Sequence, residues 1–216
     1  MSLAPTLDLE REIFASGVRS LASIDEVGRG AIAGPVTVGV VVITPSCGEP
    51  PEGVRDSKLL SPARRLALIE PIIAWASAHA VASATSGEVD ELGIVGALRL
   101  AGVRALMTLE SSGVTPDLVL LDGSHDWLTS VSLFDDPSSF QAPPVRTQVK
   151  GDLTCASVAA ASVLAKVNRD AQMAALDERF PAYGWSGNKG YGAPGHQQAI
   201  RELGVTEFHR VSWNIQ

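Results

Sequence analysis

The sequence has little cysteine, few aromatic residues and no long uncharged apolar run. Its two cysteines, Cys47 and Cys155, stand far apart and without CxxC spacing, which gives no support to a disulfide framework or a zinc site. The first residues, MSLAPTLDLERE, are acidic where a signal peptide is basic, and no uncharged apolar stretch approaches the roughly 20 residues that cross a bilayer. We therefore expect a cytoplasmic protein without a membrane partner.

Basic residues are also scarce, with 17 Lys and Arg against 24 Asp and Glu and a net charge of −7. This balance argues against a polyanionic partner, because nucleic-acid-binding proteins usually present a basic face. The charge is segregated, however: residues 1–139 hold 9 basic against 18 acidic side chains, and residues 140–216 hold 8 against 6. If acids of the first part bind divalent cations, the basic last third can face phosphates. On composition alone, an acidic protein with no nucleic-acid role is the alternative.

A chain of 216 residues with 45% hydrophobic residues can bury one substantial core, so we expect a single domain over 1–216. Hydrophobic periodicity predicts an α/β fold, with a glycine-rich segment and a C-terminal helical extension near 190–216. Residues 123–144, rich in Ser, Asp and Pro, predict a long mobile loop. The expected helices are 9–18, 61–78 with Ser61 as N-cap, 87–111, 153–180 and one before residue 204, and the expected strands are 19–26, 35–43, 79–86, 116–123 and 144–152.

Four carboxylates, those of Asp25, Glu26, Asp122 and Asp152, lie at or just past the end of an expected strand. If these strands are neighbours, the acids converge and repel one another unless hard cations hold them. Two Mg²⁺ or Mn²⁺ ions about 4 Å apart are the usual arrangement for phosphodiester hydrolysis. The pattern favours a nuclease, although each acid taken singly also fits ordinary turn chemistry.

The stretch Gly28-Arg29-Gly30 follows the first acidic pair directly. Glycines let a backbone approach a ligand closely, and an arginine adds positive charge beside it. We interpret the triplet as a substrate contact next to the metal ligands. A plain turn is the alternative interpretation.

These motifs resemble, in order and over nearly the whole chain, those of ribonuclease HII, the type 2 ribonuclease H. The matching stretches are DEVGRGAIAGPV from 25, RDSKLL from 55, LLDG from 120, KGD from 150, ASVAAASVLAKVNRD from 156, NKGYG from 188 and FHRVSW from 208. The resemblance implies a ribonuclease H-like fold, a five-stranded mixed sheet flanked by helices, with the C-terminal extension closing over the substrate. It also assigns Asp25, Glu26, Asp122 and Asp152 as the catalytic metal ligands.

The implied reaction is hydrolysis on the 5′ side of ribonucleotides, in RNA/DNA hybrids or in DNA with single embedded ribonucleotides. The products carry a 3′-hydroxyl and a 5′-phosphate, two Mg²⁺ or Mn²⁺ ions assist, and the biological role is ribonucleotide removal from DNA. The backbone of Gly28, Arg29 and Gly30 is expected to contact the 2′-hydroxyl, the group that distinguishes RNA from DNA. Tyr191 matches a tyrosine that senses the RNA–DNA junction.

Other matching residues have less specific roles. Lys58 and Lys189 are candidate phosphate contacts, with a solvated surface lysine as the alternative. His196 is expected to be structural, whereas His209, Arg210 and Trp213 fit packing or phosphate contact equally. Gly93 stands where the family leads us to expect asparagine. We expect a monomer, and the sequence identifies no protein partner.

Three alternatives were weighed. Ribonuclease HIII shares DEVG but usually has a glycine-threonine-glycine motif, a final glutamate ligand and an extra N-terminal domain, so Arg29 and Asp152 favour HII. A catalytically weak module that binds RNA/DNA hybrids would be favoured by loss of one of the four acids, and all four are present. A DNA-specific nuclease of the same fold is disfavoured by Gly28–Gly30 together with Tyr191.

Overall fold

The computed structural model describes residues 4–129, 140–213 and 215. The strands are β1 (Leu21–Val27), β2 (Val36–Ile43), β3 (Ala78–Ala84), β4 (Leu118–Asp122) and β5 (Val145–Gln148). The α-helices are α1 (Asp8–Ala15), α2 (Pro62–Trp75), α3 (Ser86–Ser111), α4 (Gly151–Thr154), α5 (Ala156–Arg179), α6 (Trp185–Asn188) and α7 (Pro194–Leu203), and short 3₁₀ turns lie at Ser57–Leu59, Pro181–Tyr183 and Val211–Trp213.

The five strands form one mixed sheet in the order β3-β2-β1-β4-β5. Strand β1 pairs antiparallel with β2 and parallel with β4, and β4 pairs parallel with β5. The parallel register sets Ile24 opposite Leu121, so Asp25 and Asp122, the residues that follow them, lie side by side near the carboxyl ends of β1 and β4. The five-stranded mixed sheet and its antiparallel first pair confirm the expected architecture.

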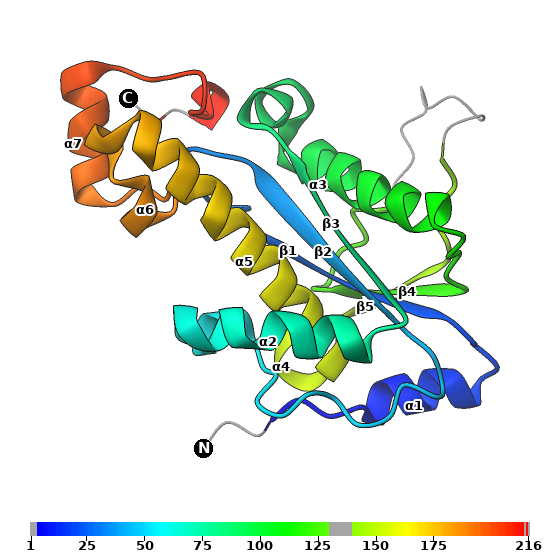
Figure 1. The fold of residues 1–216 in the computed structure, drawn as a ribbon. Coiled ribbons are helices and arrows are strands. Elements are labelled where there is room, and N and C mark those ends of the chain that lie inside the picture. The colour runs from blue at the N-terminus through cyan, green and yellow to red at the C-terminus, as the bar shows by residue number, and fades with distance from the viewer. Residues whose placement is uncertain (1–3, 130–139, 214, 216) are drawn as a thin grey trace.

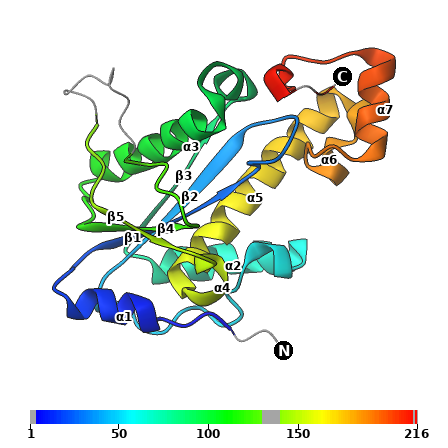
Figure 2. The same ribbon diagram turned by 180° about the vertical axis from the view of Figure 1, so that it is seen from behind.

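Helices cover both faces of the sheet (Figures 1 and 2). Helix α3 covers one face, and α1, α2 and α5 lie against the other. All eight residues of β2 are buried, which explains why VTVGVVVI is apolar except for Thr37, because a strand covered on both faces has no solvent-facing side. Buried alanines of α5, among them Ala160 and Ala161, suit a helix that lies close to the sheet.

Helix α3 has the length and the mean hydropathy, 1.6 over its most apolar window, of a membrane-spanning segment. In the fold it is instead the core helix of its face, with Val89, Leu98 and Leu106 buried against the strands. The helix is interrupted at Gly93, whose φ of 68° and ψ of 166° are not helical. The expected uninterrupted helix over 87–111 is therefore wrong at this position, where glycine supplies a conformation that other residues rarely adopt.

The position expected for Asp152 is also wrong. Strand β5 ends at Gln148, and Lys150 then adopts the left-handed conformation with a φ of 58°, which turns the chain into α4. Asp152 therefore lies in the first turn of a short helix and not at a strand end. It still reaches the same edge of the sheet, because α4 begins where β5 stops (Figure 1).

The expected helix over 153–180 is divided at Cys155, which is extended and separates α4 from α5. The cause is a contact with the N-terminal segment, because Thr6 forms a parallel bridge with Cys155. The Thr6 amide donates to Thr154 O at 3.0 Å, and the Thr6 carbonyl accepts from Ala156 N at 2.9 Å. A partner about 150 positions away in the chain thus decides where the helix breaks.

Of the expected 123–144 loop, residues 130–139 lie outside the described residues. The part before them is anchored, because Trp127 and Leu128 are buried in the core next to Gly102 of α3. The C-terminal elements α6 and α7 pack on the end of α5 around a separate apolar cluster that contains Met173, Trp185 and Ile200 (Figure 1).

Candidate active site

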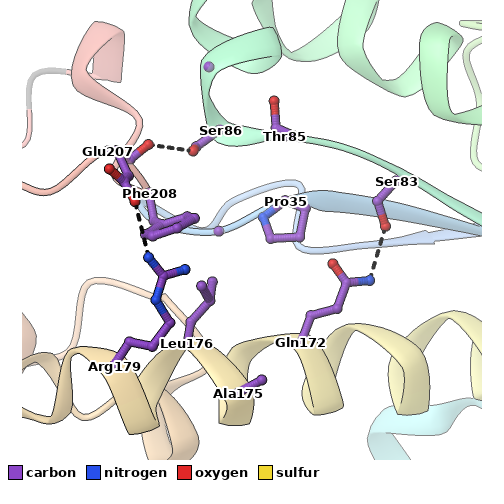
Figure 3. A pocket seen from close by; sticks show the side chains of 12 residues that line it. Pro35, Ser83, Thr85, Ser86, Gln172, Ala175, Leu176, Arg179, Glu207 and Phe208 are labelled. Carbon is purple, nitrogen blue, oxygen red and sulfur yellow. Dashed lines mark hydrogen bonds and ion pairs between the residues drawn. The ribbon is translucent and has the colours of Figure 1, made fainter.

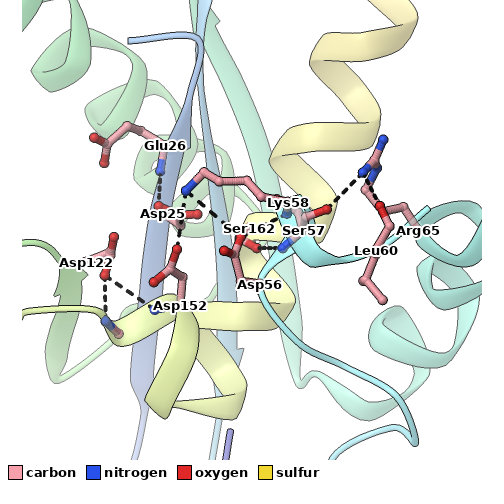
Figure 4. A network of polar contacts seen from close by, with 11 residues as sticks. Asp25, Glu26, Asp56, Ser57, Lys58, Leu60, Arg65, Asp122, Asp152 and Ser162 are labelled. Carbon is pink, nitrogen blue, oxygen red and sulfur yellow. Dashed lines mark hydrogen bonds and ion pairs between the residues drawn. The ribbon is translucent and has the colours of Figure 1, made fainter. Parts of the chain in front are cut away.

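Three carboxylates from separate elements gather at the carboxyl edge of the sheet (Figure 4). Asp25 comes from β1, Asp122 is the last residue of β4, and Asp152 comes from the first turn of α4. Asp25 and Asp152 are 5% and 7% exposed, so both carboxylates are largely removed from water. The expected meeting of strand ends thus occurs for Asp25 and Asp122, and Asp152 reaches the same place from a helix.

Backbone amides fix two of the three acids. Asp122 Oδ1 accepts from Gly151 N at 2.7 Å and from Asp152 N at 3.4 Å, so Asp122 caps α4 and positions Asp152. Asp25 Oδ1 accepts from Glu26 N at 2.8 Å. The capping contact is invisible in the sequence, because it joins residues about 30 positions apart.

Glu26 lies near the other three acids but is paired with an arginine. Its charge raises the pKa of Asp25, and the Asp122 carboxylate raises that of Glu26. Successive strand residues point to opposite faces, so the Glu26 side chain leaves β1 in a different direction from that of Asp25 (Figure 4). Its Oε1 pairs with Arg29 Nη1 at 3.3 Å. The four expected acids therefore lie near one another, with Glu26 held by Arg29.

Burial raises the pKa of Asp25 well above its usual value, and the nearby carboxylates of Glu26 and Asp122 raise it further. Burial also raises the pKa of Asp122, helped by Asp152, and that of Glu26, where Arg29 opposes the effect. Buried carboxylates that repel one another are oxygen donors suited to a hard divalent cation, whose charge would offset theirs. This donor set fits a divalent metal, although in the described part of the chain no three His, Cys, Asp or Glu side chains are arranged to hold an ion.

Lys58 brings a positive charge to the acids. Its Nζ lies 3.4 Å from Asp152 Oδ2 and 4.0 Å from Asp56 Oδ1. Burial opposes protonation, but the Asp56, Asp25 and Asp152 carboxylates outweigh it and raise the pKa of Lys58. Lys58 therefore lies beside the acids and pairs with Asp152, and its contact with a phosphate stays a prediction.

The loop that carries Lys58 is anchored by residues that sequence reasoning missed. Buried Asp56 accepts from Lys58 N at 2.9 Å, and Ser57 N donates to Ser162 Oγ on α5 at 3.0 Å (Figure 4). Arg65 donates to Leu60 O at 2.6 Å. The one signal in the sequence is the Asp-Ser-Lys triplet, because an aspartate can accept a hydrogen bond from the amide two residues later, as Asp56 does from Lys58.

The glycine-rich segments meet beside the acids. A Cβ built on Gly30 would lie 4.0 Å from Tyr191 Cε1, so the expected tyrosine stands next to the Gly28-Arg29-Gly30 loop with 41% of its surface exposed. Lys189 precedes it in the left-handed conformation, with a φ of 54°. The structure thus brings Tyr191 to the loop, whereas no polar contact joins Lys189 to the acids among the described residues.

A mixed sheet in this strand order, with buried acids at the carboxyl ends of its central strands, defines a nuclease of the ribonuclease H-like fold. Residues 22–216 match the family model described as Ribonuclease HII. The chain belongs to the ribonuclease HII family, and it is therefore a ribonuclease H, an enzyme that hydrolyses RNA strands internally.

Relatives with the same family name cover almost the whole chain. Ribonuclease HII of Streptomyces avermitilis is 46% identical over 210 residues, which are 97% of this chain and 83% of that protein. Ribonuclease HII of Paracoccus denitrificans is 42% identical, with 97% and 91% covered. Among solved structures, ribonuclease H2 from Pyrococcus horikoshii OT3 superposes with a TM-score of 0.70 at 26% identity and covers 91% of this chain and 94% of that one.

Proposed function

We propose that this enzyme cleaves the phosphodiester on the 5′ side of a ribonucleotide, in RNA/DNA hybrids and in DNA that contains single ribonucleotides. The products carry a 3′-hydroxyl and a 5′-phosphate. The observation that carries the proposal is the gathering of buried Asp25 and Asp152 with half-buried Asp122, beside a glycine-flanked loop and an exposed tyrosine. Family membership supports the ribonuclease activity itself.

Asp25, Glu26, Asp122 and Asp152 are the proposed ligands of two divalent ions, Mg²⁺ or Mn²⁺. When bound, such ions activate water and stabilise the leaving 3′-oxygen. Asp122 also has a structural role, because it accepts a hydrogen bond from the Gly151 amide and so holds α4, and with it Asp152, in place. Glu26 pairs with Arg29, which connects this set of ligands to the Gly28-Arg29-Gly30 loop.

The Gly28-Arg29-Gly30 backbone and Tyr191 are the proposed readers of the ribonucleotide. Backbone amides and a phenol hydroxyl recognise a 2′-hydroxyl by hydrogen bonding, and the ring can stack on a sugar or base. Lys58 is the proposed phosphate contact nearest the acids, with Lys189 as a second one on the adjoining segment. Residues 190–216, part of the same single domain, close over the bound duplex.

The wider setting is also proposed. The enzyme acts in the cytoplasm as a monomer and removes ribonucleotides that have been incorporated into DNA. The rival function is a catalytically weak module that binds RNA/DNA hybrids. The four retained acids favour catalysis, since a module that only binds polyanions gains nothing from a buried cluster of negative charge.

The test is cleavage of a DNA duplex with one embedded ribonucleotide, beside an all-DNA duplex, in Mg²⁺, Mn²⁺ or chelator. Asp122→Asn keeps an oxygen acceptor for the Gly151 amide but removes the charge, so it should abolish cutting without unfolding α4. Asp117→Asn is the matched control, because Asp117 caps the other end of β4 by accepting from the Arg19 and Ser20 amides.

Metal-dependent cutting 5′ to the ribonucleotide, lost in Asp122→Asn and kept in Asp117→Asn, is the expected result. Equal cutting of the all-DNA duplex would make the protein a DNA nuclease. Binding of the ribonucleotide duplex without cutting in any metal would favour the hybrid-binding module.

A further inference from the structure

Two arginines far apart in the sequence, Arg169 on α5 and Arg210 near the C-terminus, are fully buried. Neither forms an ion pair in the described part of the chain, and both donate to backbone carbonyls. Burial lowers the pKa of Arg210 to about 10 and also lowers that of Arg169. Since a buried charge without a carboxylate partner is costly, these side chains are better explained by what they hold than by stability alone.

What they hold is the segment from Gly28 to Pro35. Arg210 donates to Gly28 O at 2.8 Å, to Arg29 O at 3.0 Å and to Gly34 O at 3.0 Å. Arg169 donates to Pro35 O at 2.7 Å and to Ala33 O at 3.2 Å. Its remaining nitrogen, Nη1, donates to Lys189 O at 2.8 Å, which ties the same network to the segment that carries Tyr191.

Packing fixes the second half of this segment, where Ala31 and Ala33 to Pro35 are buried, but Arg29 and Gly30 are exposed. Gly34 and Pro35 also border a cavity of about 540 Å³ between α5, the start of α3 and residues 207–208 (Figure 3). The exposed Arg29–Gly30 turn has little packing of its own, so its position depends on hydrogen bonds. The two planar guanidinium groups supply these bonds in fixed directions, which the single nitrogen of a lysine cannot do.

The carbonyl directions decide where the amides point. In a trans peptide the C=O and the following N–H are antiparallel. With Gly28 O and Arg29 O turned to Arg210, the N–H groups of Arg29 and Gly30 face away from it. Neither N–H has a hydrogen-bond acceptor within the described chain, and Tyr191 lies next to Gly30, with its Cε1 4.0 Å from the position of a Cβ there. The loop therefore presents two free donors beside the tyrosine.

We propose that Arg210 and Arg169 are positioning residues that determine ribonucleotide selectivity, by holding the Gly28–Pro35 carbonyls inward so that the Arg29 and Gly30 amides reach the 2′-oxygen. The inference rests on the proposed function. It assigns the discrimination between RNA and DNA to two side chains that never touch the substrate.

The test separates selectivity from catalysis. In the Asp122→Asn background, which keeps the duplex intact, the dissociation constants of a duplex with one ribonucleotide and of its all-DNA counterpart are measured by fluorescence anisotropy in Mg²⁺. Adding Arg210→Lys should lower the ratio of the two affinities about tenfold, because at least one donated hydrogen bond is lost, while all-DNA binding changes less than about twofold. Arg210→Ala should regain selectivity when ethylguanidinium is added.

Two further variants keep the result interpretable. Leu109→Ala, a core change on α3 far from the loop, should lower the unfolding midpoint and leave the affinity ratio unchanged. If Arg210→Lys does not fold, Arg169→Lys disturbs the other half of the network and gives the same test. An affinity ratio within about twofold of the parent in the folded arginine variants overturns the proposal. A parent that binds both duplexes equally contradicts the proposed function instead.

Discussion

Acidification should destabilise the protein through one buried histidine, His209. Its Nδ1 accepts from Thr206 N at 2.9 Å, so the ring proton sits on Nε2 and is donated to His196 Nε2 at 3.1 Å. His196 also accepts from Trp185 Nε1 and is left to donate from Nδ1 to the Tyr191 carbonyl at 2.9 Å. Both rings are therefore neutral, and a proton added to His209 Nδ1 would face the Thr206 N–H.

Burial, helped by the neighbouring His196, lowers the pKa of His209 from 6.5 to about 4. Because the folded pKa lies below the unfolded one, the unfolded chain binds the proton first, so stability is complete above pH 6.5 and falls as the pH drops toward 4. One pKa unit corresponds to about 1.4 kcal/mol, so the free energy of unfolding should fall by about 3 kcal/mol across this window.

The assay is urea unfolding of wild type, His209→Gln and His79→Gln at several pH values from 7 to 4. His79 is exposed on β3 and serves as the matched control. Burial raises the pKa of Glu10 and so acts in the opposite direction, which is why the difference between proteins is measured. His209→Gln should lose the acid-dependent part of the instability. The reasoning is refuted if His209→Gln and wild type lose stability in parallel.

Two further predictions concern the substrate side of the site. In Gly28→Ala the new Cβ would lie 2.1 Å from Arg169 Nε, at a φ of +84°. Thermal unfolding should show that the free energy of unfolding falls by about 2 kcal/mol or more. The preference for the ribonucleotide duplex over the all-DNA duplex should be lost as well. Gly17→Ala, at a φ of +104° with nothing within 4 Å, should show backbone strain alone, and an equal loss in both variants would contradict the clash. Lys58→Met should reduce the slope of log affinity against log salt by about one, as expected for one lost phosphate contact. An unchanged slope would show that Lys58 does not contact a phosphate and serves only to pair with Asp152.

Local signals in the sequence predicted most of the fold. The Ser61 cap is confirmed, because Ser61 Oγ accepts from Arg64 N at 3.3 Å at the start of α2. Helix α2 then continues through Pro71 to Trp75, although a proline inside a helix usually bends or breaks it. One error comes from a long-range contact, because Thr6 divides α4 from α5. Another comes from a local turn, because the left-handed conformation of Lys150 moves Asp152 from a strand into a helix.

The sequence predicted which residues form the candidate site, but not how their side chains are arranged. Recurrence of acids at strand ends pointed to Asp25 and Asp122, and the register of β1 and β4 explains why they meet. The sequence could not show that Glu26 turns toward Arg29, because adjacent carboxylates read alike until the strand fixes their directions. Nor could it show the buried roles of Arg169 and Arg210, since a buried arginine and a surface arginine look the same in a sequence.

The segregation of charge acquires a physical meaning in the fold. The first two thirds of the chain supply Asp25, Glu26 and Asp122, and the more basic last third supplies Asp152 and the segment that packs against the loop from Gly28 to Pro35. Gly34 N donates to Phe208 O at 2.8 Å and Arg210 N donates to Ile32 O at 2.9 Å, which docks the C-terminal segment against this loop. Two cations of the first part, Arg29 and Lys58, already pair with Glu26 and Asp152, so the negative charge at this edge is partly offset within the chain. The loop from Gly28 to Pro35 therefore takes its full set of hydrogen bonds only when the segment around Phe208 and Arg210 lies against it.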